Sequence, residues 1–185
     1  MKPSLILGLA WALAAVPGAR AGTLALDRPQ SWVEVDVKAT VGTFIGRLAE
    51  FDFSAHGDPA GDEIATGVFR ADFASLTTGN AARDRDMNDW QQTGKYPEVV
   101  FSLDELASAP DGSRVARGRL RLHGVERALI LPVLIAANQQ TLVVTGEVPL
   151  DTRDYGLPVI RTLLVLKVDP IVHVRFHVQL RRIVP

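Results

Sequence analysis

The chain lacks cysteine altogether, and this absence removes several kinds of chemistry at once. Without thiols there are no disulfides, no thiolate nucleophiles and no thiolate ligands for a metal. A domain without disulfides depends on its hydrophobic core for stability. A chain of 185 residues is long enough for this, because domains of about 150 residues bury close to 70% of the surface that the unfolded chain exposes.

An excess of basic residues is also missing, since 20 Lys and Arg stand against 21 Asp and Glu. Proteins that bind the phosphate backbone of nucleic acids carry a basic surface, so we expect no nucleic-acid partner. Catalytic motifs such as G-x-S-x-G and H-E-x-x-H are absent as well. We therefore expect no enzyme activity, no catalytic residues and no covalent cofactor.

The four histidines do not predict a metal site. His173 and His177 share one face of a predicted strand, but four residues of strand span roughly 13 Å, too far for two ligands of one ion. We expect both to face the solvent. His123 precedes Gly124 and is expected to hydrogen-bond the turn there, and the segment DTRDYG at residues 151–156 is expected to form a turn of its own.

Long apolar runs are missing after the first 21 residues, so no transmembrane helix is predicted there, because such a helix needs about 20 apolar residues. The first 21 residues have the features of a secretory signal peptide: Lys2, an apolar stretch over residues 5–16, and an A-x-A motif at residues 19–21. We expect residues 1–21 to be cleaved and residues 22–185 to form a single periplasmic domain.

Alternation of apolar and polar residues is the clearest pattern in the rest of the chain. Three valines alternate with charged residues in Trp32–Lys38, and residues 172–181 repeat the pattern. This period of two is the signature of a strand with one buried face. Similar segments bounded by turn-forming residues predict further strands near residues 43–54, 65–74, 98–107, 114–123, 126–137, 140–151 and 161–168. About nine strands joined by short turns favour an all-β fold, either an antiparallel sandwich or a closed barrel.

Two segments depart from this simple pattern. Residues 80–92 contain no β-branched residue, and their apolar residues recur near helical spacing, which predicts a short helical insertion that caps the barrel mouth. Residues 129–135 are apolar on both faces of a predicted strand. Such a strand needs an apolar neighbour on each face, which leaves open a homodimer contact on the outer one.

Four segments, in this order, resemble the YceI-like family of polyisoprenoid-binding proteins. They are TTGNAARDRDM at residues 77–87, GKYPEVVF at residues 94–101, GRLRLHGVERALILPV at residues 118–133 and PLDTRDYGLP at residues 149–158. The resemblance implies a lipocalin-like antiparallel barrel of about eight strands around a long hydrophobic tunnel, with an isoprenoid chain as ligand. Many relatives have a histidine and aromatic residues after the Arg-Asp pair, where this chain has Asp86–Trp90. The resemblance therefore does not predict which head group binds at this end of the site.

An isoprenoid chain requires only a dry, long, apolar cavity, because burial of each methylene is worth about 0.8 kcal/mol. The candidates to line it are inward-facing apolar residues: Phe44, Phe69, Phe73, Phe101, Leu120, Leu122 and Phe176. The alternative is that these side chains simply fill the barrel. For a polar head group, Asn80 and Arg83 in the capping segment are the candidates, since a guanidinium can donate two hydrogen bonds to a phosphate. The alternative there is an Arg83–Asp84 ion pair that fixes the segment to the barrel.

These observations lead to one hypothesis and one alternative. The hypothesis is an exported protein that holds an isoprenoid quinone or a prenyl phosphate for transport or storage, with transient membrane contact. The alternative is a non-catalytic interaction module with a packed barrel, either dimeric or docking to a membrane redox protein.

Overall fold

The computed structural model describes residues 23–40, 42–57, 64–108, 113–162 and 166–183. The predicted signal peptide lies outside the described residues. Within them the secondary structure is almost entirely β-strand, with one α-helix and three short 3-10 turns.

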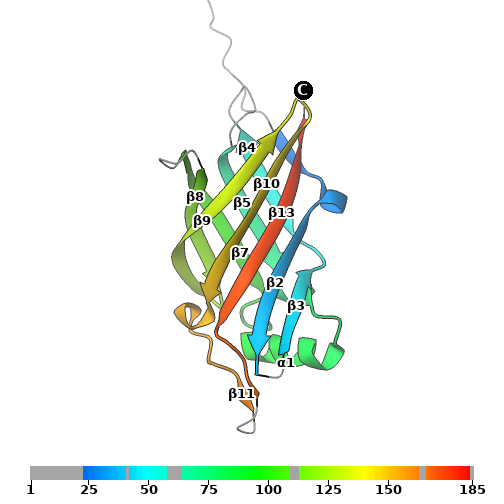
Figure 1. Cartoon of the computed structure of the whole chain (residues 1–185), viewed down its shortest axis with the longest axis vertical. Coiled ribbons are helices and arrows are strands. Elements are labelled where there is room, and N and C mark those ends of the chain that lie inside the picture. Colours follow the sequence, from blue (N-terminus) through cyan, green and yellow to red (C-terminus); the bar gives the residue numbers. More distant parts are fainter. Residues whose placement is uncertain (1–22, 41, 58–63, 109–112, 163–165, 184–185) are drawn as a thin grey trace, which may run out of the picture.

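Eight strands form a closed antiparallel ring (Figure 1). In order around the ring they are β1 (Thr23–Leu26), β4 (Asp52–Gly57), β5 (Ile64–Asp72), β7 (Glu98–Ser108), β8 (Arg114–Leu122), β9 (Val125–Ala137), β10 (Thr141–Asp151) and β13 (Ile171–Ile183). The ring closes because β13 pairs with β10 on one edge and with β1 on the other. The antiparallel barrel of about eight strands is therefore confirmed.

Three further strands extend the sheet at one end of the barrel. After the turn η1 (Arg28–Gln30), β2 (Trp32–Ala39) pairs with β13 on the same edge as β1, and β3 (Gly42–Leu48) and β6 (Leu76–Thr77) follow in order. The single strand predicted at residues 43–54 is thus wrong. The chain breaks there because β3 pairs with β2 whereas β4 pairs with β1.

The segment between β10 and β13 is the second difference from the prediction. Residues 161–168 were expected to form one more strand of the sheet. Instead β11 (Arg161–Thr162) and β12 (Leu166–Lys167) pair with each other in a separate small sheet that projects beyond the barrel (Figure 1). They lie outside the ring because β10 pairs directly with β13 over all of residues 141–151.

The predicted helical insertion is confirmed as α1 (Ala81–Gln91), which follows the turn η2 (Phe73–Ser75) and β6. The Asn80 side chain accepts hydrogen bonds from the amides of Ala82 and Arg83, both at 3.1 Å. This is the usual way in which asparagine caps a helix N-terminus. The helix lies at the same end of the barrel as the β11–β12 hairpin (Figure 1).

The strands present an apolar face to the interior and a polar face to the solvent. In β13, Phe176 faces inward opposite Val33 of β2. On the outer face of the same strands, Arg175 donates to Asp36 at 2.8 Å and to Glu34 at 3.0 Å. The alternation in the sequence thus places apolar side chains in the interior and ion-paired side chains on the outer face.

Candidate functional site

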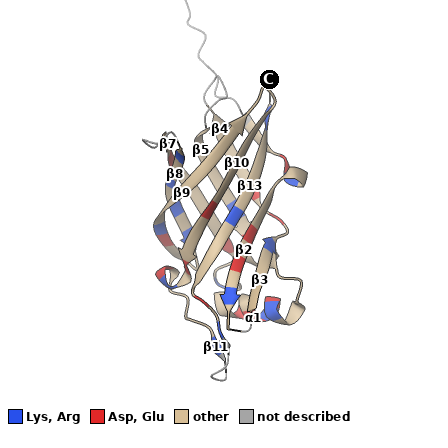
Figure 2. Cartoon of the chain, in the orientation of Figure 1, with Lys and Arg blue, Asp and Glu red and all other residues tan. Residues whose placement is uncertain are grey.

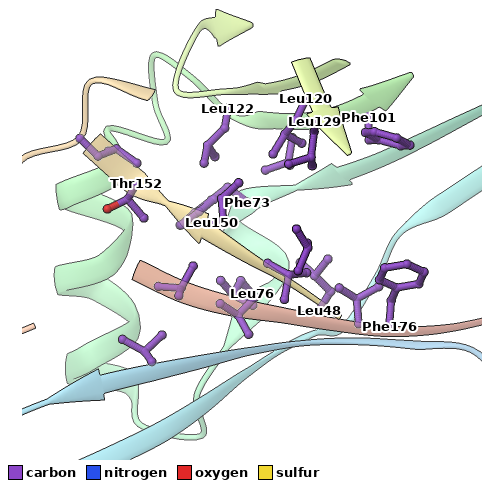
Figure 3. A pocket seen from close by; sticks show the side chains of 18 of the residues that line it. Leu48, Phe73, Leu76, Phe101, Leu120, Leu122, Leu129, Leu150, Thr152 and Phe176 are labelled. Atoms are coloured by element: carbon purple, nitrogen blue, oxygen red, sulfur yellow. The ribbon is translucent and has the colours of Figure 1, made fainter. Parts of the chain in front are cut away.

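The barrel encloses a cavity of about 900 Å³ with a largely apolar lining (Figure 3). Side chains from strands around the ring, from β2 and β3, and from α1 contribute to this lining. At the end of the barrel away from α1, four residues of the hydrophobic core are almost fully buried and do not line the cavity: Leu24, Ala55, Leu142 and Leu180. The cavity is thus bordered by packed core residues at this end, and its other end meets the helix.

All nine predicted ligand-binding residues line this one cavity. The seven apolar residues are Phe44, Phe69, Phe73, Phe101, Leu120, Leu122 and Phe176, and the two polar ones are Asn80 and Arg83. Figure 3 shows Phe73 of η2 and two residues of β8, Leu120 and Leu122, pointing into the same space. Most of the apolar ones also belong to the hydrophobic core or pack against it.

Two glycines make room for the aromatic rings of the lining. A Cβ atom on Gly118 would lie 2.6 Å from the ring of Phe101 and 2.3 Å from the carbonyl oxygen of Ser102. A Cβ atom on Gly146 would lie 2.5 Å from the ring of Phe176. Each ring therefore lies directly against the backbone of the neighbouring strand, where any larger residue would push it into the cavity.

Several lining residues were not among the predicted ones. Val35, Val148 and Val174 face the cavity from regular strands, and the alternation alone could have identified them. Leu76 and Thr152 also line it but lie in or beside short turns, where the sequence has no period from which a direction could be read.

The polar part of the lining gathers at the α1 end. It comprises Asn80, Arg83, Asp86, Thr152, Arg161 and Asp169. These residues come from α1 and its cap, from the turn η3 (Thr152–Tyr155), from β11 and from the residue pair before β13. A molecule with a long apolar tail and a polar head would match this division.

Hydrogen bonds to a carboxylate fix the start of α1. Asp84 accepts from the Thr78 hydroxyl at 2.6 Å, from the Thr78 amide at 2.9 Å and from the Thr77 hydroxyl at 2.8 Å. The Thr78 hydroxyl is the main reason why the pKa of Asp84 lies below its usual value. The helix is thus fastened to β6 and the residue after it.

Arg83 has a different contact from the predicted ion pair with Asp84. Its guanidinium lies over the ring of Phe44, 4.3 Å from the ring centre, so this cation faces an aromatic wall of the cavity. Among the described residues no ion pair joins Arg83 to Asp84, because the oxygens of Asp84 are directed at the threonines. Asp84 does fix this segment, but its partners are Thr77 and Thr78 and not Arg83.

The far end of α1 is joined to the opposite side of the mouth. The indole N–H of Trp90 donates to the carbonyl oxygen of Pro158 at 2.8 Å, and both residues line the cavity. This bond ties the helix to the segment that follows η3. The helix therefore spans the mouth and is held at both ends.

The three histidines considered in the sequence do not line the cavity. His123 Nδ1 is 3.1 Å from the carbonyl oxygen of Tyr155, so its partner is in η3 and not in its own turn, which corrects the prediction. His173 lies against Glu147 at 3.1 Å on the outer face, and His177 stacks on Trp32. In η3, Asp151 accepts from the Arg153 amide at 3.0 Å, as expected for turn chemistry.

The described residues contain no group of three or more His, Asp or Glu side chains arranged to hold a metal ion. Nor do they contain a helix of the length and apolar character needed to cross a membrane.

Three solved structures share the fold. BcnA of Burkholderia cenocepacia is 22% identical, with a TM-score of 0.72 over 83% of this chain and 98% of that one. A polyisoprenoid binding domain from Saccharophagus degradans is 20% identical, with a TM-score of 0.65 over 88% and 99%. The YceI protein of Campylobacter jejuni is 15% identical, with a TM-score of 0.61 over 98% of both chains.

Sequence comparison extends this likeness. A UPF0312 protein of Vibrio campbellii is 30% identical over 173 residues, which cover 86% of this chain and 90% of the relative. A UPF0312 protein of Vibrio cholerae is 26% identical over 171 residues, with the same coverage. The model of the YceI-like domain matches residues 24–180, which span the barrel from β1 to β13. The chain therefore belongs to the YceI-like family.

Proposed function

We propose that this protein binds one polyisoprenoid-type lipid in the barrel cavity and carries or stores it without chemical change. The observation that carries the proposal is the division of the cavity into an apolar body and a polar mouth. A cavity of about 900 Å³ lies within the usual range for small-molecule sites, roughly 300–1,000 Å³. The relative from Saccharophagus degradans, named as a polyisoprenoid binding domain, supports the same ligand class.

The nine predicted residues are assigned to the two ends of this ligand. The seven apolar ones contact the tail, for which burial of each methylene contributes about 0.8 kcal/mol. Asn80 and Arg83 face the head group. The charged lining residues of the mouth are Arg83, Arg161, Asp86 and Asp169, two of each sign, and this balance favours an uncharged quinone head over a phosphate.

The cellular setting is part of the proposal. Residues 1–21 act as a cleaved signal peptide, and residues 22–185 work as a single domain in the periplasm. The protein needs no covalent cofactor and performs no catalytic step, since binding by tail burial requires neither.

Native mass spectrometry of the exported protein tests this function, followed by organic extraction and mass analysis of what is released. We expect one isoprenoid lipid per chain, with a quinone as its head group. A prenyl phosphate would keep the tail assignment and overturn the head-group argument. A protein that carries no lipid and takes up no added prenyl quinone would contradict the function itself.

A second candidate, self-association, rests on the outer face of β9. Ile130 and Leu134 on that face are 59% and 72% exposed, and Pro132 between them is exposed as well. Exposed apolar side chains in one row mark contact surfaces more often than bare solvent-facing walls. The cavity argues against a packed barrel, which was part of the alternative predicted from the sequence. A contact through the outer face of β9 does not depend on the cavity.

Sedimentation velocity tests the second candidate. We expect the wild-type protein to sediment as a dimer and Leu134→Glu to sediment as a monomer, because a buried unpaired carboxylate is costly. Thr66→Glu on β5, another exposed strand position, serves as the control and should leave the dimer intact. A wild-type monomer at all concentrations would exclude the contact.

A further inference from the structure

One side of the mouth has an apolar rim. Pro158, Val159 and Ile160 line the cavity, yet Pro158 is exposed and the other two are only half-buried. The same segment leads into the β11–β12 hairpin, which projects beyond the barrel (Figure 1). The lining of the cavity thus continues outward to the molecular surface at this point.

The hairpin is held firmly to the barrel. Thr40, just after β2, donates its amide to the Lys167 carbonyl oxygen at 3.0 Å, and its hydroxyl accepts from the Lys167 amide at 3.2 Å. The amide of Val168 donates to the Ile160 carbonyl oxygen at 3.1 Å. We call residues 158–161, Lys167 and the neighbouring Lys38 the hairpin edge. These hydrogen bonds fix this edge relative to the mouth of the cavity.

The cations of this edge differ from those of the barrel wall. On the wall, Arg47, Arg119 and Arg175 each lie within 3.0 Å of a carboxylate. Among the described residues no carboxylate pairs with Lys38 at the end of β2 or with Lys167 of the hairpin, nor with Arg161 beside it. Figure 2 shows this basic end of β2 and of the hairpin.

The neighbouring acidic residues reduce this positive charge only in part. Asp169 shares a small surface pocket with Lys38 and Lys167, and its carboxylate accepts from the Ile171 amide at 3.0 Å. Three cations against one carboxylate leave the edge positive in a chain whose formal net charge is −1. Unpaired cations around an apolar rim are the combination that binds the surface of an anionic bilayer.

We propose that this edge docks on a bilayer containing anionic phospholipid and so turns the mouth of the cavity toward the membrane. The inference rests on the proposed function, since an isoprenoid lipid resides in a bilayer. Its tail must pass from the bilayer into the cavity without exposure to water. The physical basis of the docking is separate: the cations Lys38, Arg161 and Lys167 approach the lipid phosphates, and Pro158–Ile160 enter the interface.

Co-sedimentation with vesicles tests the docking. The exported protein is mixed with vesicles of phosphatidylglycerol and phosphatidylcholine, or of phosphatidylcholine alone, at low and high salt. We expect binding only to the anionic vesicles, with a steep loss as salt rises. The variant Lys38→Gln/Lys167→Gln should bind roughly 30-fold more weakly, because each cation near such a surface contributes about fivefold.

The control variant Arg117→Gln/Arg181→Gln removes the same charge from the barrel wall, where both side chains are exposed. It should bind the vesicles within about twofold of the wild type. Equal binding to neutral vesicles, equal losses in the two variants, or no vesicle binding at all would overturn the docking, and the last result would point to a protein partner instead.

A second measurement separates this inference from the proposed function. Lys38 and Lys167 do not contribute to the lining of the main cavity. Uptake of a prenyl quinone from detergent, without vesicles, should therefore be equal in the wild type and in Lys38→Gln/Lys167→Gln. A protein that binds anionic vesicles but takes up no quinone would refute the function and leave the docking in place.

Discussion

At the scale of single residues, the glycines opposite the aromatic rings control the shape of the cavity. Gly118 allows the ring of Phe101 to lie close against the backbone of β8, and Gly146 allows the ring of Phe176 to lie close against the backbone of β10. Glycine normally weakens a strand, because it has no side chain to pack. Here the lost packing is the reason why large rings and an open cavity fit into one barrel.

The substitution Gly118→Ala should destabilise the protein by about 1–3 kcal/mol, the usual cost of overpacking. Its Cβ atom would lie 2.3 Å from a backbone oxygen, so the strand itself must move. Chemical denaturation gives the free energy of unfolding. Gly94→Ala is the matched control, since nothing lies within 4 Å of its Cβ position. Equal stability of the two variants would show that the close approach has no energetic weight.

The direction of a side chain could be predicted from the sequence where the backbone forms a regular strand. Phe69, Leu120 and Phe176 could be placed inward because every second residue of a strand shares a face. The contact of Arg83 with Phe44 could not be predicted, because it joins α1 to a strand distant in sequence. Leu76 and Thr152 were missed because they lie in or beside turns.

At the scale of elements, α1 lies across the mouth of the closed ring. It is fastened at its start by Asp84 and near its end by Trp90. This helix could be predicted from the composition of residues 80–92 and the spacing of their apolar residues alone. The β11–β12 hairpin was predicted wrongly, since an apolar run of strand-forming residues does not reveal whether the neighbouring strands still have a free edge.

The attachment of α1 should depend on pH through Asp84. The folded protein holds the pKa of this carboxyl below its usual value, so its contribution to stability is present above about pH 4 and is lost as the pH falls through the folded pKa. Asp84→Asn should therefore be less stable than the wild type at neutral pH by about 1 kcal/mol.

Denaturation of both proteins from neutral to acidic pH measures this effect. The difference between wild type and Asp84→Asn should shrink below about pH 4. Asp89→Asn on the same helix is the control, because Asp89 is exposed and its side chain makes no hydrogen bond within the described structure. A difference that stays constant over the whole pH range would argue against the role of the ionised carboxylate.

At the scale of the whole molecule, the open interior distinguishes this barrel from a packed one. Ala116 and Arg117 are neighbours on β8, and they face opposite sides of the wall: Ala116 lines the cavity and Arg117 is exposed. Replacement of each by the same large residue thus separates the effect of cavity volume from that of the residue itself. Tryptophan is suitable, because its side chain buries roughly 200 Å².

Ala116→Trp should reduce the amount of lipid bound at least tenfold, since the indole would occupy the space of the tail, whereas Arg117→Trp should bind as the wild type does. Mass analysis of extracted lipid from each purified variant gives the comparison. Thermal unfolding of Ala116→Trp shows whether the fold is kept. A folded Ala116→Trp with a full load of lipid would place the ligand outside the cavity.

The closure of the ring through β13 also has a consequence for the time at which the protein can fold. Thr23 pairs with Ile183, and the same C-terminal strand pairs with β2 and β10. A nascent chain in which β13 has not yet been made lacks the strand with which β1, β2 and β10 all pair, so the ring cannot close at that stage. Contacts between such distant parts of a sequence also form slowly. The eight-strand ring can thus close only after residues 171–183 have been synthesised.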